Sequence, residues 1–244
     1  MSSFDNENVD ITVRLRGRRQ FQTDAAATAG DIKQIDRALE KALASLLDER
    51  LTSGGSLQDP VPILASAATS IDRELGGGVR GVRWWVTPYH SYEMSPAAQS
   101  SPQDSVLVRQ RFDFSASHRL HNPAMSEAEN RARFGKCNNP AGHGHNYVIE
   151  PAVRVALGPG FDRAFTHADL QDLCTSAIIS RFDHTHLNMD TAEFSEKTGV
   201  LPTVENIARV FFEILAPRIA AHGGASLASM TVWETDRTSS TYPG

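Results

Sequence analysis

The sequence predicts an α+β fold in which two successive segments each follow the order ββααββ, with antiparallel strands. Stretches that alternate apolar and polar residues are typical of strands, whereas apolar residues spaced by three and four are typical of amphipathic helices. Both patterns occur in this order twice along the 244 residues. Residues 95–104, SPAAQSSPQD, have the composition of a linker between the two segments.

The second segment, residues 105–244, has the clearer pattern. It opens with VLVRQRFDFSASH, where the alternation around Val106, Val108 and Phe112 predicts a strand. The other expected elements are a strand over 146–157, helices over 169–181 and 203–221, and two closing strands after a Gly-Gly break at 223–224. Pro217 lies near the end of the second helix, which we expect it to kink or terminate.

The first segment, residues 1–97, follows the same order more loosely. Its expected elements are strands over 9–17 and 19–23, helices over 31–51 and 62–75, and a strand or hairpin over 78–94. The string VRWWVTPYHSYEM takes the place that MTVWETDRTSSTY takes in the second segment. We therefore interpret the sequence as two tandem units. The first is degenerate, because it has no cysteine and a single histidine, His90.

Composition limits the possible classes of function. A formal net charge of -5 argues against general nucleic-acid binding, and the basic run RLRGRR at 14–19 is more typical of a solvated strand edge. No signal peptide and no bilayer-length apolar run is visible. The two cysteines, Cys137 and Cys174, provide no disulfide framework. We expect a cytoplasmic protein without a membrane partner.

Three histidines are candidates for a metal site. His143 and His145 are two residues apart, so on a strand both imidazoles point to one face. His118 lies at the end of the preceding predicted strand and can face the same point if the two strands pair. Three imidazoles with an open fourth position are typical of catalytic zinc, although other divalent ions accept the same ligands.

Other residues offer acid–base chemistry. Cys137 lies in a polar loop, where a thiol can ionise more easily, whereas Cys174 lies on an apolar helix face and is expected to be buried. Asp183 and His184 place a carboxylate beside an imidazole that can transfer protons. Glu234 lies within a strand. If it points inward it needs a partner, such as the paired N–H groups of a heterocycle; an outward-facing glutamate fits the pattern equally well.

Together these residues resemble the 6-pyruvoyltetrahydropterin synthase family. The matching strings are FSASHRL, FGKCNNPAGHGHNY, FDHTHLN, PTVEN and VWETD, in that order, and they cover the sequence from Val106 onward. The resemblance implies the tunnelling fold, in which the strands of ββααββ units join into a barrel. It also implies a homo-oligomer with active sites between units. The extra segment ahead of the motifs departs from the one-unit length of typical members.

The resemblance implies a lyase that converts 7,8-dihydroneopterin triphosphate, a small-molecule substrate, to 6-pyruvoyltetrahydropterin with loss of triphosphate. By match, zinc would be bound by His118, His143 and His145. Cys137 would be the general base, and Asp183 and His184 would relay protons from a neighbouring unit. The pterin would be bound by Glu234, Thr203 and Glu205. The triphosphate needs cations, for which Lys136 and Arg119 are near enough in sequence.

Two alternatives stay open at this stage. Members that make 6-carboxytetrahydropterin for queuosine synthesis usually have a shorter C-x3-H-G-H loop. The loop here is C-x5-H-G-H, from Cys137 to His145, and it contains no glutamate; both features favour the pyruvoyl product. The other alternative is a zinc-bearing pterin-binding or assembly protein without turnover, which the intact Cys137, Asp183, His184 and Glu234 argue against.

Overall fold

The computed structural model describes residues 9–14, 20–25, 37, 40–41, 60–74, 79–94, 105–195, 197–198 and 200–244. The protein divides into two compact units: Met1–Val108 with Arg154–Arg163, and Arg109–Val153 with Ala164–Gly244. Most of the expected helix over 31–51, most of the basic run, and the predicted linker over 95–104 lie outside the described residues. No described helix has the length and hydropathy needed to cross a membrane.

The first unit contains the hairpin that the sequence predicts near its end. Its described elements are β1 (Val9–Arg14), β2 (Gln20–Ala25), α2 (Pro60–Glu74), β3 (Val79–Trp85) and β4 (His90–Met94). The strands pair antiparallel in the order β1-β2-β3-β4. Helix α2 buries Val61, Leu64, Ala68 and Ile71 on one face and packs against β3 and β4. These described elements occur in the expected order, the expected first helix lies mostly outside the described residues, and descent from a duplicated unit stays a prediction.

The second unit is built on a long hairpin. Strand β6 (Phe112–His118) pairs antiparallel with β7 (His143–Ala156), and His118 lies directly opposite His143. The strand expected from Val106 is interrupted at Arg111, which separates β6 from β5 (Ser105–Gln110). Strand β9 (Ala225–Thr235) pairs with β7 and with β10 (Thr238–Tyr242). The short β8 (Thr185–His186) runs parallel to β6, whereas the pairs β6–β7 and β9–β10 are antiparallel.

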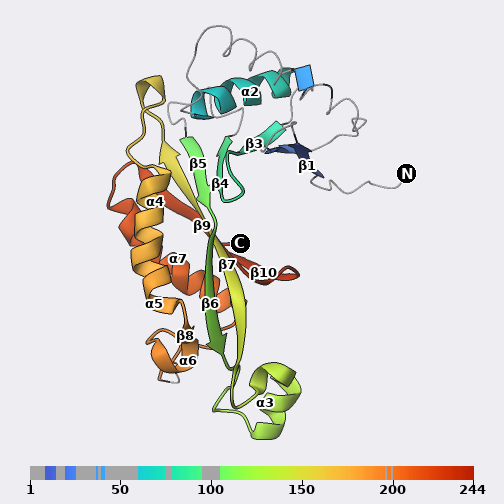
Figure 1. Cartoon of the computed structure of the whole chain (residues 1–244), viewed down its shortest axis with the longest axis vertical. Helices are drawn as coiled ribbons and strands as arrows, with labels where there is room; N and C mark the ends of the chain where they lie inside the picture. Colours follow the sequence, from blue (N-terminus) through green and yellow to red (C-terminus); the bar gives the residue numbers. More distant parts are fainter. Residues whose placement is uncertain are drawn as a thin grey trace, which may run out of the picture. The chain divides into compact units, whose positions relative to one another are not determined.

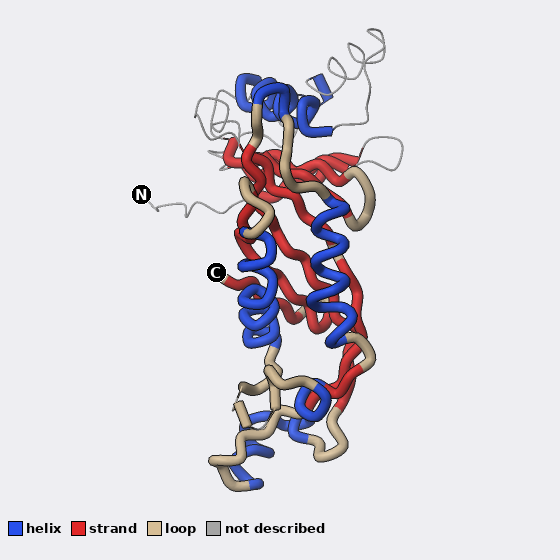
Figure 2. Tube along the Cα trace, turned by 90° about the vertical axis from the view of Figure 1, so that its left-hand side faces the viewer, coloured by secondary structure: helices blue, strands red, loops and turns tan. Residues whose placement is uncertain are grey.

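Two helical segments cover one face of these strands (Figures 1 and 2). The first consists of α4 (His167–Cys174), a π-helical turn (Thr175–Ile179) and α5 (Ser180–Phe182). Its buried positions are Leu170, Cys174, Ala177, Ile178 and Phe182. The second is α7 (Val204–Ala220), which packs against β9 and β10. The predicted α+β fold with ββααββ order is therefore confirmed in this unit, and so is the burial of Cys174.

Two local expectations differ from the structure. Helix α7 spans nearly the expected range, and it continues through Pro217 to Ala220, so Pro217 does not terminate it; the Arg218 guanidinium donates to the carbonyl of Ile214 in this last turn. Helix α3 (Glu127–Phe134), which lies at the far end of the β6–β7 hairpin in Figure 1, was not predicted from the sequence. Asn130 is its one buried residue, so it has no apolar periodicity to detect.

Candidate metal centre and active site

Three imidazoles converge where β6 ends and β7 begins. Because His118 and His143 are opposite each other in the strand register, and His145 is two residues along, all three rings lie on one face of the hairpin. The Nε2 atoms of His118 and His143 are 3.0 Å apart. The ring centroids of His143 and His145 are 4.9 Å apart. The three imidazoles therefore lie together, as the sequence predicts.

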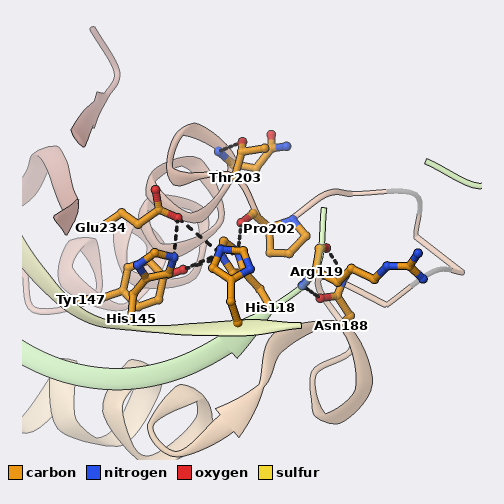
Figure 3. Close-up of polar contacts among 10 residues, drawn as sticks. His118, Arg119, His145, Tyr147, Asn188, Pro202, Thr203 and Glu234 are labelled. Atoms are coloured by element: carbon orange, nitrogen blue, oxygen red, sulfur yellow. Dashed lines mark hydrogen bonds and ion pairs between the residues drawn. The ribbon is translucent and has the colours of Figure 1, made fainter. Parts of the chain in front are cut away.

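A backbone carbonyl orients the first of these rings. His118 is fully buried, and its Nδ1 lies 2.7 Å from the carbonyl oxygen of Pro202, the residue that precedes the cap of α7 (Figure 3). A carbonyl only accepts, so Nδ1 bears the proton and Nε2 keeps its lone pair. Burial lowers the pKa of His118 to about 4, so the ring is neutral near pH 7. This is the state that a metal ligand requires.

Glu234 joins the histidines from β9. Its Oε1 lies 3.3 Å from Nε2 of His118 and 3.4 Å from Nε2 of His145 (Figure 3). The sequence left the direction of this carboxylate open, and the structure shows that it faces inward. One ligand atom from each of the three histidines and from Glu234 lies within 4.8 Å of the others.

The donor set fits a divalent ion of the zinc type. Nitrogen from imidazole and oxygen from carboxylate are common zinc ligands. Among the described residues, Nε2 of His145 and Nδ1 of His143 are buried without a hydrogen-bond partner. Buried polar atoms are rarely left without a hydrogen bond, and an ion among these rings would give Nε2 of His145 a partner in addition to its 3.4 Å contact with Glu234. Tyr147 is fully buried beside the cluster and stacks on Phe114 with centroids 4.9 Å apart.

Cys137 is held close to this cluster by the backbone. It lies in a short 3-10 helix, Gly135–Asn138, and its carbonyl accepts from the N–H of Leu120 at 2.8 Å. The side chain of Asn138 donates to the carbonyl of Leu120 at 2.8 Å. These two bonds fix the cysteine loop to the residues that follow His118. Cys137 and His143 both line a cavity of about 650 Å³.

The environment of the Cys137 thiol differs from the expectation of easy ionisation. Burial, and then the nearby charge of Glu234, raise the pKa of Cys137 above its ordinary value. The same two causes raise the pKa of Tyr147. The sequence identified the polar neighbours of the cysteine, but it contained no signal that a carboxylate from β9 would approach it.

Gly142 permits the close approach of the histidine loop. Its φ is +72°, and a Cβ there would lie 2.9 Å from Nε2 of His186 and 3.0 Å from the carbonyl oxygen of His118. Both distances are shorter than ordinary Cβ contacts, so this position needs glycine. His186 was not among the predicted site residues. Its Nδ1 is buried without a partner among the described residues, and its Nε2 lies beside Gly142.

Asp183 and His184 form a pair next to β6. One carboxylate oxygen of Asp183 accepts from the N–H of Ser115 at 2.8 Å, and the other lies 2.9 Å from Nδ1 of His184. The bond from Ser115 is the largest cause that lowers the pKa of Asp183. The His184 side chain is 81% exposed. It lines a second cavity, of about 450 Å³, together with His145 and His186.

This pair makes no direct contact with the thiol. Within the described part of the protein, no hydrogen bond or ion pair joins Asp183 or His184 to Cys137. The imidazole of His184 instead faces solvent. The structure therefore brings the three histidines, Glu234 and Cys137 together, whereas His184 shares only the second cavity with His145 and the Asp183–His184 pair makes no hydrogen bond or ion pair to Cys137 among the described residues.

The remaining predicted residues lie at the start of α7. The Thr203 hydroxyl caps the helix by accepting from the N–H of Asn206, and Glu205 is exposed in the first turn. Neither lines the two cavities described above. A residue that the sequence analysis overlooked is Asn188, whose side chain accepts from the N–H of Arg119 at 2.8 Å and donates to its carbonyl at 3.1 Å (Figure 3). It fixes the backbone next to His118.

Comparison with known proteins identifies relatives of the second unit. The sequence profile described as 6-pyruvoyl tetrahydropterin synthase matches residues 107–244. A 6-pyruvoyl tetrahydrobiopterin synthase of Homo sapiens is 37% identical over 137 residues, which cover 56% of this chain and 90% of the human protein. A protein of the same name from Poecilia reticulata is 36% identical over 153 residues, covering 62% of this chain and 99% of its own.

A solved structure of a protein with the same description has a similar fold. The structure of Caenorhabditis elegans 6-pyruvoyl tetrahydropterin synthase superimposes with a TM-score of 0.51 at 36% sequence identity. The match covers 57% of this chain and 96% of the nematode protein. All three similarities cover little more than half of this chain and most of the relative.

Proposed function

The chain belongs to the 6-pyruvoyl tetrahydropterin synthase family, and we propose that it is a zinc-dependent lyase acting on 7,8-dihydroneopterin triphosphate. The proposed products are 6-pyruvoyltetrahydropterin and inorganic triphosphate. The observation that carries the proposal is the convergence of His118, His143, His145 and Glu234 within 4.8 Å. Cys137 shares a cavity with one of these histidines.

The reaction needs no external oxidant or reductant. A proton leaves a carbon of the substrate's side arm and the C–O bond to triphosphate breaks, so that the carbon that carried triphosphate ends as a methyl group. The two hydroxyl carbons of the arm become carbonyls, and the dihydropterin ring gains two hydrogens, which balances the oxidation. Zinc bound by His118, His143 and His145 would polarise the oxygens of that arm and acidify the neighbouring C–H bond. The protein must therefore supply a base, a proton relay and an anchor for the ring.

Cys137 is the proposed base. A thiol of raised pKa gives a strong base once it is ionised, and proton transfer is efficient only within hydrogen-bond reach of the substrate. Two hydrogen bonds fix the cysteine loop to Leu120, and they hold the thiol at the distance from the substrate that proton transfer requires. Glu234 is the proposed anchor, because an inward carboxylate can accept two N–H groups of a pterin.

The Asp183–His184 pair is the proposed relay. Asp183 accepts from Ser115 and faces Nδ1 of His184, which orients the imidazole and leaves Nε2 for proton transfer. Because the described contacts leave this pair apart from Cys137, we propose that it serves the site of a neighbouring unit in a homo-oligomer. Thr203 and Glu205 are proposed to line the pterin pocket in that assembly.

The two-unit organisation belongs to the same proposal. Residues 105–244 would form the catalytic unit, and residues 1–97 a related unit without site residues. The first unit would then contribute to the assembly and not to the chemistry, in a protein of the cytoplasm.

A product assay tests the proposal. Zinc-loaded protein is incubated with 7,8-dihydroneopterin triphosphate, and the pterin product is identified by mass. We expect the 6-pyruvoyl product and one equivalent of triphosphate. A 6-carboxy product would preserve the site and assign the protein to deazapurine synthesis. Zinc binding without any product would contradict the lyase and leave a pterin-binding protein.

A further inference from the structure

The cavity that contains Cys137 extends to the helix that the sequence analysis missed. Its lining includes Cys137 and His143, and also Glu127 and Arg131 of α3 and Lys136 of the following turn. Glu127 and Arg131 are four residues apart, so the helix presents both side chains to the same side. The cavity therefore joins the proposed base to a pair of cations.

Both cations are available to a ligand. Arg131 and Lys136 are exposed, and within the described residues neither forms an ion pair or a side-chain hydrogen bond. Their shared cavity, of about 650 Å³, is large enough for several phosphate groups. Glu127 is the one carboxylate in its lining, so the two cations outnumber it.

Arg119, which the sequence also suggested for the phosphates, has a different role. Its Nε donates to the carbonyl of Asn138 at 3.2 Å, and its Nη2 lies 3.5 Å from the amide oxygen of the same residue. These contacts tie its guanidinium to the cysteine loop. It is also absent from the residues that line this cavity.

We propose that Arg131 and Lys136 form the polyphosphate subsite, which holds the phosphate tail of the substrate and the triphosphate that leaves. This inference rests on the proposed function and specifies the residues that receive its leaving group. Charge-assisted bonds from guanidinium and ammonium groups to phosphate are among the strongest polar contacts in proteins. Because the base and the cations line one cavity, a single bound substrate can reach both.

Glu127 has the opposite effect. A carboxylate in the same lining repels phosphate and reduces the net positive charge of the cavity. It thereby weakens the binding of the leaving group and favours its release. Removal of this charge should strengthen the binding of triphosphate, whereas removal of either cation should weaken it.

The test measures binding of inorganic triphosphate to the zinc-loaded full-length protein by calorimetry. We expect Arg131→Gln and Lys136→Gln each to weaken binding by on the order of tenfold, and Glu127→Gln to tighten it several-fold. Arg133→Gln is the matched control. Arg133 is on the same helix, lies over the Phe134 ring at 5.8 Å and does not line the cavity. Orthophosphate serves as the ligand control, because it has a single phosphate group and a lower charge than triphosphate.

The outcomes separate this inference from the proposed function. If turnover is present but the KM for substrate and the inhibition by triphosphate are the same in Arg131→Gln, Lys136→Gln and Arg133→Gln, the subsite is wrong and the lyase stands. If no turnover occurs but triphosphate binds through these two cations, the subsite stands and the reaction is wrong. Equal weakening by all three substitutions would indicate a general charge effect and would overturn the subsite.

Discussion

The Nε2 atoms of His118 and His143 lie 3.0 Å apart, where β6 and β7 pair residue against residue. Nδ1 of His118 donates to Pro202, so its Nε2 presents a lone pair to the neighbouring ring. Two facing lone pairs repel each other unless a proton or a cation lies between them. A proton on Nε2 of His143 satisfies this contact as a hydrogen bond in the metal-free protein, and a cation bound by both nitrogens would replace that proton.

The first prediction concerns metal content. His143→Ala removes one of the three imidazoles, and we expect the affinity for zinc to fall by at least about tenfold. Elemental mass spectrometry of the purified protein measures the occupancy. The control is His222→Ala, because the His222 ring packs against Phe165 with centroids 5.3 Å apart, away from the cluster. Full zinc occupancy in His143→Ala would show that the ligands are different.

The second prediction concerns stability and pH in the metal-free protein. The pKa of His118 falls from 6.5 to about 4 on folding. Between these values the unfolded protein binds a proton that the folded protein does not, so acidification destabilises the fold. We expect a loss on the order of 2–3 kcal/mol from pH 6.5 to pH 4.

Urea unfolding at several pH values in the presence of a chelator measures this loss. The lowered pKa of Asp183 acts in the same direction but only at lower pH, as its carboxylate becomes protonated. His118→Asn should remove most of the slope above pH 4. A flat profile in the wild-type protein would mean that His118 is not buried as a neutral ring.

The third prediction concerns the thiols. Cys137→Ala should keep zinc and fold but lose turnover by about 100-fold or more, because it removes the proposed base. Cys174→Ala is the control. Cys174 is fully buried, so its loss should cost about 1 kcal/mol of stability and leave the activity per folded molecule unchanged. Normal turnover in Cys137→Ala would remove this residue from the mechanism.

The fourth prediction separates two roles of Glu234. If the three imidazoles hold the ion and Glu234 anchors the pterin, Glu234→Gln keeps zinc and raises the KM for substrate by on the order of tenfold. The pKa of Cys137 should also fall, because the Glu234 charge is one of the causes that raise it. The rate of thiol alkylation against pH reports that change. Loss of zinc in this variant would make Glu234 a metal ligand.

The fifth prediction uses two glycines with nearly the same φ angle. Gly142 has φ +72° and Gly160 has φ +70°, but a Cβ at Gly160 meets nothing within 4 Å. Gly160→Ala should therefore cost about 1 kcal/mol for the positive φ alone. Gly142→Ala should cost more and lower zinc affinity, because its Cβ would displace His186 or the backbone of His118. If both substitutions changed stability and zinc affinity equally, the backbone around Gly142 could shift to accommodate a Cβ.

Much of the second unit could be predicted from the sequence, because its elements are periodic. The apolar spacing in α4 and α7 indicates helices, and alternation in β6 indicates a strand. Helix α3 could not be found in this way, since it buries only Asn130. Its signal was the capping box, in which Ser126 and Glu129 bond each other's backbone N–H groups. A search for that pattern would have found it, and Arg131 with it.

The candidate site also has a part that the sequence predicts and a part that it does not. The spacing of His143 and His145 places both rings on one face, and strand pairing adds His118. The approach of Glu234 depends on the pairing of β9 with β7, which the residues around Glu234 do not specify. The carbonyl of Pro202 that orients His118 is a backbone group, so no residue type in the sequence indicates it. The raised pKa of Cys137 follows from those distant contacts, so local composition suggested the wrong direction.

The spread of the converging donors along the sequence has a consequence for folding. They extend from His118 on β6 to Glu234 on β9, and if the Glu234→Gln test makes Glu234 a fourth ligand, the ion closes the long stretch of chain between these two strands. Closing a long loop restricts the unfolded protein, and an ion that binds only the folded state adds stability by mass action. The centre would then act as a removable cross-link between β6 and β9, and a chelator would lower the unfolding temperature of the second unit as well as its turnover.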